Sequence, residues 1–123
     1  MQAKETVLDF YQLCFVQKQP RAAFERYVAG TLVQHNPAVA DGAEPALASL
    51  EERLRQNPQI HFDIRHVIAE GDMVALHLLV KSNNEERGRA VVDIFRVRDQ
   101  RIVEHWDVVQ TVPETAANSH PMF

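Results

Sequence analysis

The chain has 123 residues, 46% of them hydrophobic and 24% charged, which is typical of a globular protein of one domain, residues 1–123. Its net charge is −4 and it has no basic cluster, so we expect no nucleic acid as a partner. The sequence shows no signal-peptide pattern, no apolar run reaches the ~18 residues of a membrane helix, and the lone Cys14 excludes an internal disulfide. We therefore expect a cytoplasmic protein without a membrane segment.

The first half of the chain is predicted to be helical. Apolar residues recur at spacings of three and four over residues 1–17 and again over residues 44–56. Pro20 suits the first turn of a further helix over residues 20–27. A short extended piece, residues 31–35, separates the last two helices.

The second half is predicted to form four strands in a meander. They run from Ile60 to Glu70, from Met73 to Ser82, from Ala90 to Val97 and from Ile102 to Val109, and polar turns or loops join them. Helices followed by such a meander predict an α+β fold. We expect a cone-shaped α+β barrel, with three N-terminal helices packed on a strongly curved antiparallel sheet around a cavity.

The sheet face away from the helices is also predicted to be apolar. Several strands carry hydrophobic residues at both alternating sets of positions, so this second face needs a cover. A second copy of the chain is the simplest cover, which predicts a homodimer.

Two carboxylates interrupt otherwise apolar strands, and such conflicts concentrate at functional sites. Asp93 lies in the third long strand and Asp107 in the fourth. Strand alternation places Asp107 on the same face as Val103 and His105, and we expect this face and Asp93 to border the cavity. The same alternation places Ile102, Glu104, Trp106 and Val108 on the outer face.

Several motifs make the chain resemble the nuclear-transport-factor-2-like superfamily, and within it the SnoaL-like proteins. The match covers nearly the whole chain. Its most specific pieces are Gln34-His35-Asn36-Pro37, Asp41-Gly42, Asp93-Ile94-Phe95-Arg96, Ile102-Val103-Glu104-His105-Trp106-Asp107 and Met122-Phe123. The resemblance implies a small-molecule cavity, because members of this fold include isomerases, cyclases, hydrolases and non-catalytic domains.

The resemblance also implies roles for single residues. In the polyketide cyclases an aspartate on the last strand is the acid or base, which matches Asp107, and a polar residue on the preceding strand assists, which matches Asp93. In the ketosteroid isomerases a helix-one tyrosine and an aspartate form the oxyanion hole, which matches Tyr11 and Asp93. The base of those isomerases corresponds to His35 here, a departure that argues against steroid isomerase chemistry.

The expected catalytic residues are therefore Asp107, Asp93 and His35, and no cofactor or metal is required. The expected pocket residues are Tyr11, Phe15, Asn36, His77, Phe95, His105 and Val109. Structural alternatives remain open: an acid paired with Arg89 or Arg96, His77 as a core histidine, or His35 in a turn. A metal site from His35, His77, His105 and an acid lacks a supporting motif.

Two functions follow from these residues. The first is a cofactor-independent lyase or isomerase that removes a proton beside a carbonyl, or closes a ring by an aldol-type step, on a small apolar carbonyl compound. The second is a non-catalytic domain that binds a small molecule in the same cone. Hydrolysis by an Asp-Arg-Asp set would need an arginine such as Arg65. The apolar residues Met122 and Phe123 are predicted to plug the mouth of the cone.

Overall fold

The helices form where the spacing of apolar residues predicts them. The computed structural model describes residues 1–123 and has α1 at Ala3–Tyr11, α2 at Pro20–Tyr27 and α3 at Ala43–Gln56. A single π-helical segment, η1 at Gln12–Val16, continues α1. Such wider turns are frequent at functional sites. None of the helices is both long and apolar enough for a bilayer crossing.

The sheet has five strands rather than four. These are β1 at Val28–Gln34, β2 at His61–Glu70, β3 at Met73–Lys81, β4 at Arg89–Arg98 and β5 at Arg101–Thr111. Their spatial order is β1-β5-β4-β3-β2, and every neighbouring pair is antiparallel except β1 and β5. The α+β fold expected from the sequence is confirmed.

The strand β1 is longer than the extended piece expected at residues 31–35, and it is part of the sheet. It pairs in parallel with β5, which places Gln34 opposite His105. This pairing brings together residues 71 positions apart in the sequence. Parallel pairing needs a long crossover, and here the whole of α3, β2, β3 and β4 separates the two strands.

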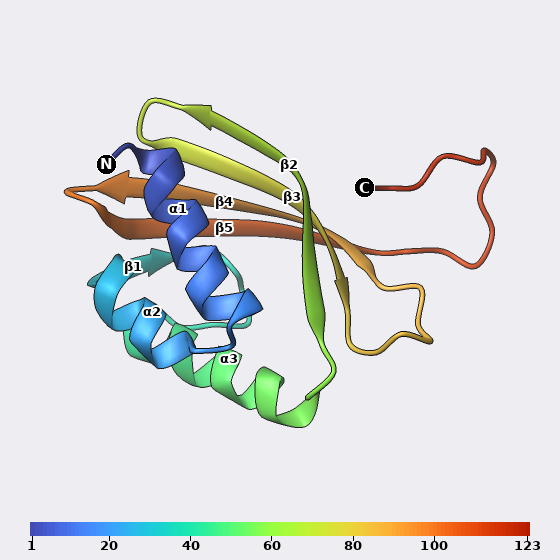
Figure 1. Ribbon diagram of the computed structural model, residues 1–123, viewed down its shortest axis with the longest axis horizontal. Coiled ribbons are helices and arrows are strands. Elements are labelled where there is room, and N and C mark those ends of the chain that lie inside the picture. Colours follow the sequence, from blue (N-terminus) through green and yellow to red (C-terminus); the bar gives the residue numbers. More distant parts are fainter.

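The helices cover one face of a curved sheet (Figure 1). On β3 the even-numbered residues from Val74 to Val80 are buried under them, as strand alternation requires. This inner face and the helices share one hydrophobic core. Its members include Val7, Phe10, Tyr11, Cys14, Leu32, Leu47, Leu76, Leu78, Phe95 and Ile102.

A bulge in β2 changes which residues face the core. The pairing with β3 shifts between Ile64 and His66, so Arg65 has no partner. Beyond it, His66 lies opposite His77 and Val67 opposite Leu76. The sequence pattern alternates Phe62, Ile64, His66 and Ile68 against their neighbours, which predicts one common face for these four residues. That prediction is wrong after Ile64, because one extra residue inverts the facing of all that follow.

A second bulge lies in β5. Arg96 pairs with Glu104 and Val97 with Ile102, which leaves Val103 without a partner. Ile102 is consequently only 2% exposed on the inner face, whereas alternation from the sequence placed it outside and Val103 inside. Beyond the bulge the expected alternation holds, so His105 and Asp107 face inward.

The C-terminal tail does not reach the mouth of the cone. Its end lies against the outer side of the sheet, where the backbone carbonyl of Met122 is 2.9 Å from His77 Nε2. The ring of Phe123 lies 5.4 Å from the guanidinium carbon of Arg65. The expected plug is therefore wrong, since these two apolar residues are partly covered elsewhere.

One buried group is unsatisfied and generates a test of the core. Thr6 is 0% exposed, and its hydroxyl has no hydrogen-bond partner. We expect Thr6→Val to raise the free energy of unfolding by about 1 kcal/mol, because it removes an uncompensated polar group at nearly constant shape. Urea denaturation would measure this, with the exposed tail variant Thr115→Val as a control. Destabilisation by the valine would contradict the prediction.

Candidate functional site

A cavity of about 210 Å³ lies between the helices and the inner face of the sheet. This volume is below the ~300–1,000 Å³ of many ligand sites, so it suits a small molecule. Fifteen of its 23 lining residues are hydrophobic. They include Phe10, Tyr11, Phe15, Phe24, Val28, Leu32, Leu50, Phe62, Val80, Val91, Phe95, Ile102 and Val109.

Aromatic rings form much of the apolar lining. Tyr11 and Phe15 are stacked with ring centroids 4.2 Å apart, and Phe62 lies 4.6 Å from Phe15. Phe10 meets Phe95 edge to face at 6.1 Å. These contacts hold the rings in fixed orientations, so the cavity presents flat apolar walls that suit a flat or cyclic ligand.

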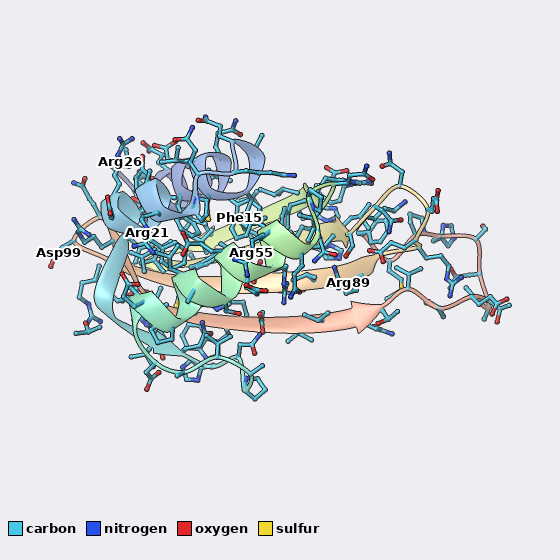
Figure 2. All side chains as sticks on the ribbon, turned by 90° about the horizontal axis from the view of Figure 1, so that it is seen from below. Phe15, Arg21, Arg26, Arg55, Arg89 and Asp99 are labelled. Atoms are coloured by element: carbon cyan, nitrogen blue, oxygen red, sulfur yellow. The ribbon has the colours of Figure 1, made fainter.

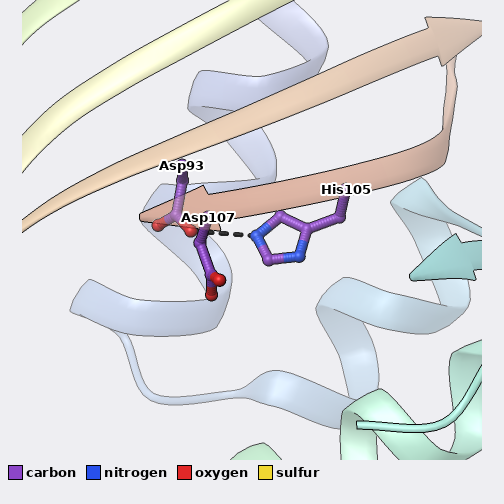
Figure 3. A group of neighbouring side chains, drawn as sticks. All are labelled: Asp93, His105 and Asp107. Atoms are coloured by element: carbon purple, nitrogen blue, oxygen red, sulfur yellow. Dashed lines mark hydrogen bonds and ion pairs between the residues drawn. The ribbon is translucent and has the colours of Figure 1, made fainter. Parts of the chain in front are cut away.

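Two carboxylates and one imidazole form a polar cluster at this cavity (Figure 3). Asp93 and Asp107 lie directly opposite one another on β4 and β5. His105 Nε2 is 2.9 Å from Asp93 Oδ1, and both side chains are about 15% exposed. Neither carboxylate forms an ion pair with an arginine, so the structural alternative of an Arg89 or Arg96 pair is wrong for both acids.

Gln34 determines the tautomer of His105. Gln34 Oε1 accepts a hydrogen bond from the backbone N–H of Asn36 at 3.0 Å, so this atom must be the amide oxygen. The same oxygen is 2.8 Å from His105 Nδ1. Nδ1 must therefore carry a proton, and one further proton lies between Nε2 and Asp93.

Asn36 holds Asp107. Its Nδ2 donates to both carboxylate oxygens, at 3.1 and 2.9 Å. Its Oδ1 accepts the backbone N–H of Ala38 at 2.9 Å, which fixes the amide orientation. Asp107 makes no other hydrogen bond with the protein, so its remaining lone pairs are available to a molecule in the cavity.

Tyr11 supplies a hydroxyl in the same cavity. Burial raises the pKa of Tyr11 well above its ordinary value, and the nearby charge of Asp93 and then Cys14 raises it further. The phenol therefore stays protonated at neutral pH. No group of the protein accepts its proton in a hydrogen bond, so the O–H is an available donor.

His35 lies outside the cavity, contrary to the expected position. Its ring stacks on Trp106 with centroids 4.6 Å apart, and its Nε2 is 2.7 Å from Glu104 Oε2. This hydrogen bond, with that of Arg96, lowers the pKa of Glu104. The reason is alternation: at the end of β1 and in the two residues after it, Gln34 and Asn36 face inward, so His35 between them faces outward.

His77 also lies on the outer face. Its Nδ1 is 2.9 Å from Nδ1 of His66, and its Nε2 bonds the carbonyl of Met122. The expected pocket role fails because the inward positions of β3 are the even-numbered ones. The three histidines considered for a metal site, His35, His77 and His105, therefore do not come together.

One set of side chains has the arrangement of metal ligands. Asp93, His105 and Asp107 each offer an atom within 4.8 Å of the others. The protein itself hydrogen bonds all three groups, through Gln34, Asn36 and the His105–Asp93 contact. Each of the three groups therefore has a hydrogen-bond partner within the protein, and Asp107 keeps lone pairs that the protein does not use.

The cavity contains every other expected pocket residue, and it adds four polar ones that the sequence reasoning missed. Tyr11, Phe15, Asn36, Phe95, His105, Val109 and both aspartates line it. The additional polar residues are Gln34, Ser49, Arg53 and Arg89. Arg89 shares the strand parity of Asp93, and that signal was readable from the sequence. Gln34 became recognisable only through the pairing of β1 with β5.

The chain belongs to the SnoaL-like polyketide cyclase family, whose model matches residues 5–117. No protein with a curated description matches this sequence. The family places the chain in a class of small α+β proteins, and it leaves the reaction and the substrate open.

Solved structures share the fold at low sequence identity. IdmH from Streptomyces antibioticus, a proposed polyketide cyclase, is 20% identical over 89% of this chain and 92% of its own, with a TM-score of 0.75. AclR from Streptomyces galilaeus, a proposed hydroxylase, is 20% identical over 90% and 80%, with a TM-score of 0.73. TsrD from Streptomyces laurentii is 17% identical over 87% of each chain, with a TM-score of 0.70.

The role of Gln34 can be tested by nitrogen NMR of the histidines. In the unaltered protein we expect His105 Nδ1 to be protonated at neutral pH. Gln34→Leu removes the acceptor, so the proton should no longer prefer Nδ1. The substitution should also lower the free energy of unfolding by about 1–3 kcal/mol, because two N–H groups lose their partner. Gln110→Leu on the exposed end of β5 is the matched control. An unprotonated Nδ1 in the unaltered protein would refute the assignment.

Proposed function

We propose that this protein is a cofactor-independent lyase or isomerase that removes a proton beside the carbonyl of a small, largely apolar compound. The observation that carries the proposal is the placement of Asp107. It borders an apolar cavity, an amide donor holds both of its oxygens, and no cation neutralises it. A carboxylate oriented in this way fits a general base.

In the proposed reaction the proton moves from the carbon to Asp107, and the electron pair of the C–H bond moves to the carbonyl oxygen. The O–H of Tyr11 donates a hydrogen bond to the developing enolate oxygen, a role that an unpaired donor in a largely apolar cavity performs well. The His105–Asp93 pair retains its own proton and keeps the nearby charge balanced.

Two outcomes of the enolate are compatible with the site. In an isomerisation, Asp107 returns the proton to a different carbon of the substrate. In an aldol-type ring closure, the enolate carbon attacks a second carbonyl of the same molecule, whose oxygen takes the proton from Asp107. Neither path requires a redox partner. The expected role of His35 in this chemistry is dropped, because its side chain is on the outer face.

The alternatives have less support. A binding domain would need no oriented base, whereas Asn36 holds both oxygens of Asp107. A hydrolase with an Asp-Arg-Asp set would need an arginine beside the two aspartates. The guanidinium of Arg65 is 3.0 Å from Asp63 and contacts Phe123 on the outer side. Arg53 and Arg89 line the cavity, but neither forms an ion pair with Asp93 or Asp107.

Asp107→Asn tests the base directly. We expect the exchange of α-protons of small aromatic methyl ketones with deuterium to fall by about 10²–10⁴-fold, the contribution of a general base. Proton NMR of the ketone in heavy water measures the exchange rate. Asp99→Asn in the exposed β4–β5 turn is the matched control, and circular dichroism verifies the fold. An unchanged deuterium exchange rate in the Asp107→Asn variant would contradict the mechanism.

We also propose that the chain is a homodimer through the outer face of the sheet. Ile68 and Val108 are 68% and 66% exposed there, and Trp106 lies on the same face. A monomer would leave this apolar surface in water. A two-fold axis allows the same patch to cover itself.

Charge on that face should dissociate the dimer. We expect Val108→Asp to halve the mass measured by sedimentation equilibrium, because the new carboxylate would lie in an apolar interface. Val16→Asp is the control, since Val16 is similarly exposed at 56% but lies on the helical side. A monomeric unaltered protein, or a dimer that survives the substitution, would overturn this assembly.

A further inference from the structure

Two arginines border the cavity outside the aspartate cluster. Arg53 lies on α3, one turn beyond Ser49 and Leu50, which also line the cavity. Arg89 begins β4 and has the same facing as Val91 and Asp93. Figure 2 shows Arg89 at the start of that strand and Arg55 on α3.

Neither of these two arginines forms an ion pair with a carboxylate of the chain. Arg21, Arg55, Arg65 and Arg96 each form an ion pair with an acid. Arg53 forms no ion pair, and the single side-chain contact of Arg89 is a long one, 3.4 Å to Ser82 Oγ. Arg26, Arg87, Arg98 and Arg101 form no ion pair either, but they do not line the cavity. Arg53 and Arg89 are therefore the cationic side chains in the cavity lining that no acid neutralises.

The two ends of the cavity therefore differ in charge, with arginines at one end and aspartates at the other. Arg89 precedes Asp93 by four residues on one extended strand, which separates their Cα atoms by about 13 Å. The arginines mark the open end, since Arg53 is exposed and Val109, across from Val91, is 52% exposed. Asp93 lies farther along β4, and the buried Val91 lies between it and Arg89 on the same face.

We propose that the substrate is an anionic carbonyl compound, with a carboxylate at the end opposite its reacting carbonyl, and that Arg53 and Arg89 bind this carboxylate at the mouth. The reacting end of this assignment rests on the proposed function, whereas the anion site does not. Guanidinium groups bind carboxylates through paired, charge-assisted hydrogen bonds. Asp93 and Asp107 repel an anion, so the compound enters carbonyl first.

The specificity can be measured with a matched pair of compounds. 4-Acetylbenzoate carries an enolisable methyl ketone opposite a carboxylate, and methyl 4-acetylbenzoate differs by lacking the charge. We expect the unaltered protein to bind the carboxylate about tenfold more tightly than the ester in calorimetric titrations, the size of a charge-assisted contact near the surface. This preference should weaken with added salt.

Substitution of both arginines should remove the preference. In the Arg53→Gln/Arg89→Gln double variant the carboxylate should bind about as weakly as the ester, and affinity for the ester should stay unchanged. Arg55→Gln is the control, because Arg55 is on the same helix but outside the cavity lining and pairs with Glu52. It should keep the preference of the unaltered protein.

The outcomes separate the two proposals. Asp107→Asn should slow the deuterium exchange of 4-acetylbenzoate by the same ~10²–10⁴-fold and keep the preference for the carboxylate. A retained preference without any exchange by the unaltered protein would refute the proposed reaction and leave the anion site standing. Three results would overturn the anion site. The unaltered protein could bind the acid and the ester equally, or it could bind neither compound up to the solubility limit. The double variant could also lose affinity for both compounds to the same extent.

Discussion

The polar site depends on the amide oxygen of Gln34. It accepts one hydrogen bond from the ring of His105 and one from the backbone of Asn36. Through the first it orients the partner of Asp93, and through the second it places the amide that holds Asp107. One side chain thus connects both carboxylates, and it reaches them because β1 pairs in parallel with β5.

This arrangement explains how a predominantly apolar cavity tolerates two acids. A buried polar group is costly unless it is paired, and each acid here has a neutral or proton-sharing partner instead of a permanent cation. Asp93 shares a proton with His105, and Asp107 accepts two N–H bonds from Asn36. A permanent cation at Asp107 would have made it a poorer proton acceptor. The neutral amide of Asn36 satisfies the carboxylate by hydrogen bonding and leaves it able to accept a proton.

Local periodicity predicted most of the helices and strands. The pairing between strands decided where the bulges fall and which side chains meet. The helices and the four meander strands follow from spacing alone, as does the inward facing of Asp93 and Asp107. The bulges at Arg65 and Val103 carry no clear signal in the sequence, so the alternation counted across them was misassigned. The partnership of Gln34 with His105 depends on two strands far apart in the chain, which a single sequence read locally does not reveal.

His35 shows what that alternation means for the protein's tolerance of change. Its ring lies flat on Trp106 outside the sheet, while its two chain neighbours turn inward to the acids. The deletion or insertion of one residue before this point would exchange the two sides, carrying an imidazole into the cavity and both amides into water. The stack and the Glu104 hydrogen bond oppose such a slip from the outside. Sequence length in this strand is therefore under stricter constraint than the identity of most residues in it.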